Sequence, residues 1–274
     1  MEHLSDTVDL NAYFQRIGYS GDYCATLQTL QAIHLCHTKA IAFENLTSLL
    51  KQPVCLNLKS LSRKLIDERR GGYCFEQNLL LRSVLLALGF KVKNLAARVL
   101  WNLPQGTITP RSHMLLLVEI DEREYVADVG FGGLTLTAPL SMIPNIEQST
   151  PHEMFRLIMA GYTYIMQAYI GQEWKSLYSF DLQEQQLADY EVSNWYVSTH
   201  PNSRFVSTLI VARPDINCRY ALQNNKFTTY HLDGQKQSLV LNTVSDLRTV
   251  LEQVFCLTLP EIPDLNTTLQ ELVK

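Results

Sequence analysis

The hydrophobic pattern of the chain changes near residue 90, and this change limits the possible fold more than any other feature. Before that point apolar residues recur at helical spacing, as in residues 9–19 (DLNAYFQRIGY) and 24–43. Residues 78–90 (NLLLRSVLLALGF) are apolar around most of a helix, which is typical of a buried helix. Residues 1–90 are therefore predicted to form a helical bundle.

Beyond residue 90 the segments are short, rich in β-branched and aromatic residues, and separated by turn residues. This pattern is typical of antiparallel strands. The predicted strand segments are residues 91–102, 113–120, 123–132, 153–170 and 173–180. A polar, proline-containing stretch at 144–153 is predicted to be a loop among them. Residues 91–185 are therefore expected to form a small β-barrel.

The last third of the chain mixes both patterns. Residues 187–201 are helical or extended, strands are predicted at 205–214 and 218–234, and residues 243–257 form an amphipathic helix with Ser245 as its N-cap. This part, residues 186–274, is predicted to be an α/β lid. Helices followed by strands and then a mixed segment indicate an α+β architecture.

Charge and composition exclude several classes of function. The net charge is −4, and the lysines and arginines are scattered, which argues against a nucleic-acid partner. No apolar run approaches the roughly 18–20 residues that span a bilayer, and the N-terminus does not resemble a signal peptide. We therefore expect a cytoplasmic protein without a membrane partner, and the sequence leaves a homo-oligomer open. The six cysteines contain no CxxC pair and are expected to be free thiols.

One cysteine lies in an unusual turn, residues 69–78 (RRGGYCFEQN). Gly71 and Gly72 permit a tight turn that leaves Cys74 in the first turn of the buried helix. Unpaired N–H groups at a helix start favour an anion, and the thiolate is the nucleophilic form of cysteine. The alternative is that Cys74 is a small apolar core residue. Two interpretations are open for the polar residues 76–78 (EQN). They orient the turn that carries Cys74, or they are ordinary polar residues of a first helical turn.

A nucleophilic thiol needs a base, and His113 opens the predicted strand 113–120. Taken alone, His113 is better explained as a hydrogen-bonded core histidine than as a functional one. Asp128 lies inside the next apolar strand, and a buried carboxylate is costly unless it is paired. A hairpin turn near residues 120–121 would place the two residues opposite one another. A turn centred on residue 122 would offset them by three residues and require a bulge.

A hydrogen bond from His113 to Asp128 would fix the histidine tautomer and stabilise the imidazolium. Cys74, His113 and Asp128, in this chain order, match the arrangement of papain-like thiol enzymes. Glycines within residues 129–133 (VGFGG) would let the backbone approach a ligand, but no helix pattern follows them, so a nucleotide-binding P-loop is excluded.

A second cluster of histidines lies in residues 34–39 (HLCHTK). On a helix His34 and His37 share a face and Cys36 does not, and no fourth ligand is evident. An ordinary helix end is therefore favoured over a metal site.

Six segments together resemble the arylamine N-acetyltransferases over nearly the whole chain. They are RRGGYCFEQN, SHMLLLV, ADVGFGG, AIAFENL (40–46), DLNAYFQRIGY and EVSNWYVSTHPNSRFV (191–206). Ala42 stands where the family usually has proline, which bears on a loop near the acceptor site. The chain lacks the interdomain insertion of the vertebrate members and so resembles the bacterial type.

This resemblance implies a papain-like, cysteine-proteinase-like core with helical bundle, β-barrel and α/β lid. It also implies ping-pong transfer from acetyl-CoA through an acetyl-cysteine, with no metal, to arylamines, hydrazines or N-hydroxyarylamines, as in xenobiotic metabolism. Cys74 would attack the thioester with His113 as base. An arylamine is largely neutral at pH 7, so it can attack without first losing a proton.

The resemblance also assigns binding roles. Phe43 and Phe131 would line the acceptor pocket, with Phe205 near it on the lid side, where aromatic side chains can stack on an aryl ring. The residues implied along the CoA path are Trp101, Ser112, Gly130, Gly132 and Gly133.

Three rival functions are compatible with the sequence. A thiol hydrolase or transglutaminase-like enzyme would use the same triad order without acetyl-CoA. An amide synthase of secondary metabolism would take a different acyl group. A catalytically inactive binding protein is the third, and the presence of all three triad residues argues against it.

Overall fold

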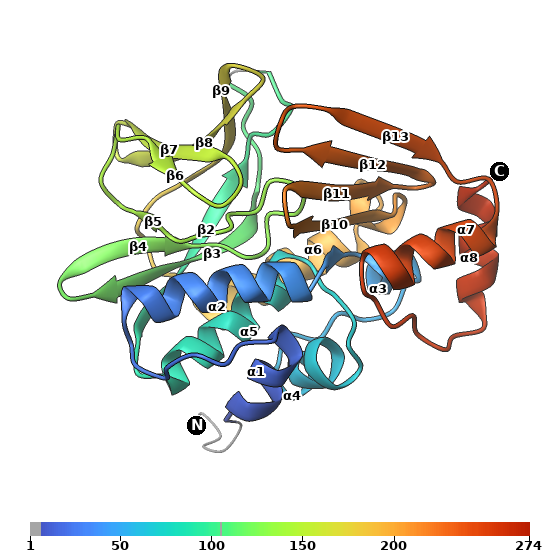
Figure 1. Cartoon of the computed structure of the whole chain (residues 1–274), viewed down its shortest axis with the longest axis horizontal. Helices are drawn as coiled ribbons and strands as arrows, with labels where there is room; N and C mark the ends of the chain where they lie inside the picture. Colours follow the sequence, from blue (N-terminus) through green and yellow to red (C-terminus); the bar gives the residue numbers. More distant parts are fainter. Residues whose placement is uncertain (1–6, 105) are drawn as a thin grey trace.

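The computed structural model describes residues 7–104 and 106–274. Residues 1–6, which belong to the segment that lacks signal-peptide character, lie outside this range. Within it, none of the helices combines the length and apolar character needed to cross a bilayer. The predicted α+β architecture is confirmed: helices α1, α2, α4 and α5 lie beneath an eight-stranded sheet on one side and a five-stranded sheet on the other (Figure 1).

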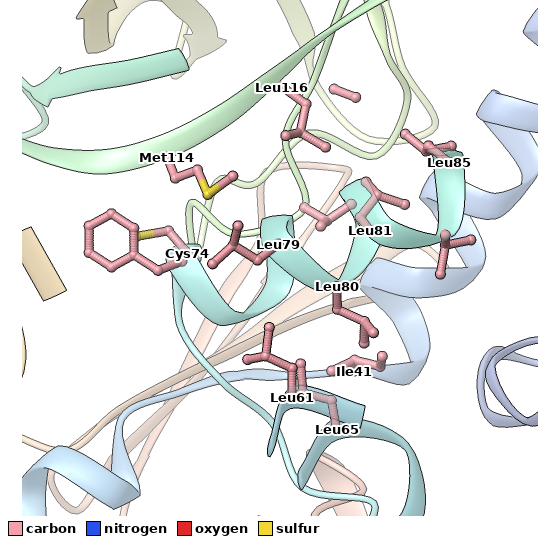
Figure 2. Packing of buried hydrophobic residues seen from close by; sticks show 14 of the residues in the cluster. Ile41, Leu61, Leu65, Cys74, Leu79, Leu80, Leu81, Leu85, Met114 and Leu116 are labelled. Atoms are coloured by element: carbon pink, nitrogen blue, oxygen red, sulfur yellow. The ribbon is translucent and has the colours of Figure 1, made fainter. Parts of the chain in front are cut away.

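The first part of the chain is helical, as predicted. Its helices are α1 (Leu10–Ile17), α2 (Leu27–Ala40), α3 (Leu46–Leu49), α4 (Leu58–Ser62) with a π-helical continuation (Arg63–Asp67), and α5 (Cys74–Ala87). Helix α1 begins at an Asp9 cap, whose side chain accepts from the Ala12 N–H at 3.0 Å, and ends at Gly18. Leucines on opposite sides of α5 pack against α4 and against Met114 and Leu116 of the sheet, which explains the apolar circumference of α5 (Figure 2).

The central part of the chain is a nearly closed antiparallel barrel. Its sheet has the order β5-β4-β3-β2-β9-β8-β7-β6. The strands are β2 (Lys91–Val99), β3 (Arg111–Ile120), β4 (Arg123–Ala127), β5 (Leu140–Ser141), β6 (Gln148–Ser149), β7 (Met154–Ala160), β8 (Thr163–Ile170) and β9 (Glu173–Phe180). The segment 144–153 was predicted to be a loop, but it contains the two-residue strand β6, which pairs with β7.

The side chains of β3 alternate between two cores. Met114, Leu116 and Val118 pack against the helices, whereas Leu115 and Leu117 fill the barrel. A strand buried on both faces has a continuous apolar run, as this one does. The barrel sheet is thereby held directly against α5.

The last part of the chain forms the second sheet, of order β1-β10-β11-β12-β13. Its strands are β10 (Ile210–Asp215), β11 (Cys218–Gln223), β12 (Lys226–His231) and β13 (Lys236–Val240), together with β1 (Phe43–Glu44). Strand β1 comes from the predicted helical bundle and pairs with β10, Phe43 lying opposite Ala212. Segment 187–201, left open between helix and strand, contains helix α6 (Leu187–Thr199). Strand β13 and helix α8 (Asp264–Leu272) were not predicted.

The N-cap predicted for the last amphipathic segment is wrong. Helix α7 (Val244–Thr249) is capped by Thr243, whose side chain accepts from the Asp246 N–H at 3.1 Å. Ser245 lies within the first helical turn. Two good capping residues lie two positions apart, and the residue that caps is the one with extended backbone, which is Thr243 at φ −130° and ψ 154°.

This geometry predicts unequal effects of two similar substitutions. Thr243→Ala should lower the free energy of unfolding by about 1 kcal/mol, because the Asp246 N–H loses its partner. Ser245→Ala, at an exposed helical position, should change it by less than about 0.5 kcal/mol. Urea unfolding of both variants measures the difference, and a larger loss for Ser245→Ala would contradict the assignment.

Candidate active site

Cys74 is the first residue of α5 and its side chain is buried, with the residue 4% exposed. The preceding residue, Tyr73, has extended backbone, and its N–H donates to the Glu76 carboxylate at 3.1 Å. The cysteine thus lies in the first helical turn, as predicted.

The glycine pair before Cys74 serves close packing and not a left-handed turn. The left-handed residue here is Arg69, at φ 50°. A Cβ on Gly71 would lie 2.2 Å from the carbonyl oxygen of Ala42. The Gly72 N–H donates to that same oxygen, and the Glu44 N–H donates back to Gly72, so the chain before Cys74 runs beside β1. Glycine is needed at position 71 because two backbones touch, and at position 72 because a Cβ would lie 2.8 Å from Oε2 of Glu76.

His113 and Asp128 lie in direct contact. The His113 Nε2 atom is 2.7 Å from Oδ2 of Asp128, and both side chains are buried. The hairpin turn is Asp121–Glu122, both residues with positive φ, and Ile120 pairs with Arg123. The register therefore lies between the two predicted alternatives.

Leu116 lies opposite Ala127, so continuing the same register would place Asp128 opposite Leu115, two residues from His113. An offset of two keeps both residues on the same face of the sheet, and the ladder ends at Ala127, so the side chains can meet.

The pKa values of both members of this pair are shifted, and that of His113 is shifted the more. Burial lowers the pKa of His113. The charge of Asp128, the hydrogen bond to Asp128 and the neighbouring Cys74 thiol raise this pKa by more, so the result is about 10. For Asp128 burial acts in the opposite direction and raises the pKa. The charge of His113 and the hydrogen bonds from His113, Gly130 and Asn78 have a larger effect than burial, so the pKa of Asp128 is lowered. The pair is therefore an imidazolium and a carboxylate at neutral pH.

Asn78 ties the start of α5 to this hairpin. Its amide nitrogen donates to Oδ1 of Asp128 at 3.1 Å and to the Met114 carbonyl at 2.8 Å. Its amide oxygen accepts from the Val129 N–H at 3.1 Å. Asn78 is one helical turn after Cys74, so it projects on the same face of the helix.

Glu76 and Gln77 hold the turn from the other side. Glu76 is buried and lies 2.7 Å from Lys64 Nζ, which is also 3.5 Å from Glu44. The Gln77 amide nitrogen donates to the Gly72 carbonyl at 3.0 Å. The side chains of EQN all contact the turn or the hairpin, which favours the orienting interpretation over ordinary first-turn polarity.

The thiol of Cys74 faces the strand that carries the histidine. Its sulfur is 3.7 Å from the carbonyl oxygen of Ser112, the residue before His113. Because His113 Nε2 is engaged by Asp128, the other ring nitrogen, Nδ1, is the one left for Cys74.

Aromatic rings surround this centre. The Phe131 and Tyr178 rings lie 5.1 and 4.9 Å from the His113 ring, measured between centroids. On the other side Phe205 packs against Phe43 at 5.9 Å and Tyr73 at 5.4 Å. The three phenylalanines predicted for the acceptor pocket thus fall into two groups, Phe131 beside the histidine and Phe43 with Phe205 beside the turn of Cys74.

The other predicted binding residues are spread along the loops near the triad. A Cβ on Gly130 would lie 2.6 Å from the Cα of Cys74, and one on Gly132 would lie 3.6 Å from the Phe43 ring. Around Gly133 a Cβ would meet open space. Trp101 is partly buried in the turn after β2 and packs against the core cluster that contains Tyr178.

Sequence reasoning missed Tyr178 and left the role of Asn78 open. The signal for Asn78 was its helical spacing from Cys74, which places both on one face. Tyr178 is an aromatic residue among many in the predicted strands, and nothing in the sequence singles it out. Its ring packs against His113 because β9 pairs with β2, which lies beside β3.

Comparison with known proteins shows which family the chain resembles. A family model described as N-acetyltransferase matches residues 26–263. Arylamine N-acetyltransferase of Escherichia coli (strain K12) is 42% identical over 248 residues, covering 90% of this chain and 88% of the relative. The arylamine N-acetyltransferase / N-hydroxyarylamine O-acetyltransferase of Salmonella typhimurium is 40% identical over the same shares.

Solved structures show the same fold. Mycobacterium marinum arylamine N-acetyltransferase in complex with CoA superposes with a TM-score of 0.93 at 35% identity, covering 97% of this chain and all of that one. The family model and these relatives define the class as an acyltransferase. The chain belongs to the arylamine N-acetyltransferase family, and the resemblance seen in the sequence is confirmed.

The close approach of Gly130 to the backbone of Cys74 gives a stability prediction. Gly130→Ala should cost about 2 kcal/mol of folding stability, because the added Cβ meets the backbone of Cys74. Gly133→Ala is the matched control and should change stability by less than about 0.5 kcal/mol. Thermal and urea unfolding test both, and equal effects of the two changes would contradict the close approach.

The His113 pair also predicts a pH-dependent stability. The pKa of His113 is 6.5 when unfolded and about 10 when folded, so its contribution is fully present below pH 6.5 and is lost as pH rises toward 10. Asp128 acts in the opposite direction: its contribution is present above its ordinary pKa of 3.8 and is lost as pH falls below that value.

The measurement compares urea unfolding of the wild type and of His113→Gln across these ranges. The difference in unfolding free energy between the two proteins should shrink between pH 6.5 and 10. A constant difference over that range would show that the histidine is not held as a cation.

Proposed function

We propose that this protein transfers an acetyl group from acetyl-CoA to an arylamine in two half-reactions, through an acetyl-cysteine on Cys74. The observation that carries the proposal is His113, buried between the Asp128 carboxylate and the Cys74 thiol with its pKa raised to about 10. A histidine held as a cation beside a thiol stabilises the thiolate. The family and the CoA complex of a relative support acetyl-CoA as the donor.

In the first half-reaction the Cys74 thiolate attacks the carbonyl carbon of the thioester. A carbon–sulfur bond to Cys74 forms, the bond to CoA breaks, and the departing CoA sulfur takes the proton of the His113 imidazolium. The products are acetyl-Cys74, neutral His113 and the free thiol of CoA. One thioester replaces another, so the step is close to balanced in free energy.

In the second half-reaction the amine nitrogen attacks the acetyl carbon. Neutral His113 accepts a proton from that nitrogen, the bond to Cys74 breaks, and the thiolate–imidazolium pair is restored. The product is the N-acetylated amine. Asp128 remains ionised throughout: it fixes the ring through Nε2 and stabilises the cation each time it forms.

The aromatic side chains support an aryl acceptor. Phe43 and Phe205 beside the turn, and Phe131 beside His113, offer ring faces and edges that can stack on an arylamine, an arylhydrazine or an N-hydroxyarylamine. The residues that we propose along the CoA path are Trp101, Ser112, Gly130, Gly132 and Gly133. In this scheme residues 1–90 supply the nucleophile, 91–185 the base and carboxylate, and 186–274 the lid.

Incubation with acetyl-CoA alone should add one acetyl group to Cys74, and an arylamine should then remove it. Intact mass measurement followed by peptide mapping detects both steps. Cys74→Ser should gain no acetyl group from acetyl-CoA. This variant should unfold at an unchanged temperature, since the two side chains are nearly isosteric. Cys256→Ser, at an exposed cysteine, is the matched control and should behave as the wild type.

The possible failures separate the rival functions. A folded wild-type protein that gains no acetyl group would contradict the proposal. An adduct formed with a different acyl-CoA, but not with acetyl-CoA, would indicate an amide synthase. Turnover of peptides or glutamine amides without acyl-CoA would indicate a thiol hydrolase or a transglutaminase-like enzyme.

A further inference from the structure

Two buried histidines lie behind the active site and take no part in the proposed chemistry. His34 and His37 are three residues apart on α2, so they share one face of that helix. Both are fully buried, at 0% exposure. Buried polar side chains are retained where they have hydrogen-bond partners. The hydrogen bonds of each ring therefore indicate what it does.

The His37 ring links the outer helix α1 to the turn of the nucleophile. Its Nε2 atom lies 2.8 Å from the amide oxygen of Gln77, and its Nδ1 atom lies 2.8 Å from the hydroxyl of Tyr13. An amide oxygen can only accept, so Nε2 carries the proton and Nδ1 accepts from Tyr13. The Gln77 amide nitrogen then donates to the Gly72 carbonyl, two residues before Cys74.

The His34 ring holds the other half of the site. Its Nε2 atom accepts the main-chain N–H of Asp128 at 3.2 Å. The neutral ring must therefore carry its proton on Nδ1, which has no hydrogen-bond partner within residues 7–104 and 106–274. An unpaired buried N–H is costly. Its retention here fits a histidine kept for the bond that it makes to Asp128.

Both rings are uncharged at neutral pH. Burial lowers the pKa of His34 to about 4, although the charge of Asp128 opposes the shift. Burial also lowers the pKa of His37 to about 3; the hydrogen bond with Gln77 opposes this shift, while His34 and Arg16 of α1 add to it. Each ring can therefore act as a fixed donor or acceptor.

We propose that His34 and His37 are positioning residues. Both project from one face of α2, and together they fix Asp128 and the turn before Cys74 relative to each other. His34 acts on the carboxylate half of the triad through a main-chain N–H. His37 acts on the nucleophile half through Gln77. Their effect on acetyl transfer rests on the proposed function, but their effect on the reactivity of Cys74 does not.

Pairs of amide variants test each link in the full-length protein. In His34→Gln the amide oxygen reaches the position of Nε2 and can accept the Asp128 N–H, whereas the shorter side chain of His34→Asn cannot. In His37→Gln an amide N–H can replace the Nε2 donor to Gln77, whereas in His37→Asn it cannot. Gln31→Ala, on the exposed face of α2, is the control.

The readout is the rate at which iodoacetamide alkylates Cys74 as a function of pH, with the exposed Cys24 and Cys55 as internal references in the same digest. The single-turnover rate of acetylation is measured in parallel. We expect each asparagine variant to slow Cys74 in both reactions by about 10- to 100-fold, with KM nearly unchanged and the alkylation profile displaced to higher pH. The glutamine variants should recover most of the rate.

Folded asparagine variants with the wild-type rate and pH profile would overturn the proposal, even if their melting temperatures fall. If His37→Asn fails to fold, Gln77→Met carries the test of the His37 link, because it removes the amide contacts with His37, Gly72 and Ile41 at similar volume. A slow Cys74 in folded Gln77→Met supports this link, and a wild-type rate overturns it. If the wild type is alkylated but never acetylated, the proposed function fails while the positioning result still stands.

Discussion

The buried carboxylate of Asp128 is the interaction on which the rest of the structure depends. It is completely buried, and a buried charge is tolerated when cations and hydrogen bonds compensate for its lost hydration. His113 supplies the cation, and Asn78 and the Gly130 N–H supply hydrogen bonds to the second oxygen. The main chain of Asp128 is held by His34. Helix α2, helix α5 and the β3–β4 hairpin therefore meet at Asp128, and the position of Cys74 at the start of α5 depends on the hydrogen bonds that this carboxylate receives.

The second constraint is close contact between backbones around Cys74. The chain at Gly71 runs against the carbonyl of Ala42, which lets β1 pass from the helices into the second sheet. The second sheet is tied to the loop after Asp128 as well. Arg219 of β11 donates to the carbonyl of Thr135, and the hydroxyl of Thr135 donates to the carbonyl of Asp128. The parts predicted separately along the sequence therefore share one site, because elements from all of them support the same loop and turn.

Local patterns predicted much of this protein. Helical and strand periodicity placed most helices and barrel strands, and the helix start at Cys74 followed from the glycines and the leucine run. Predictions failed where two local signals competed or where the partner lay far along the chain. Thr243 and Ser245 are both good caps, and backbone conformation chose between them. Strand β13 is exposed along its whole length, so it lacks the alternation that reveals a half-buried strand. Asn78 contacts a residue 50 positions away, which spacing within a helix cannot reveal.

The sequence by itself determined the residue types of the site, the helix that starts at Cys74, the hairpin that carries His113 and Asp128, and the family. These depend on local periodicity, turn chemistry and the cost of burying a charge, all of which act within a few residues. The tertiary structure alone decided the hairpin register, the contact of Asn78 with Asp128 and the use of His34 and His37 as supports. The register and these contacts depend on which elements pack together. That packing is set by apolar faces of segments far apart in the chain, and it determines which partner each buried polar group can reach.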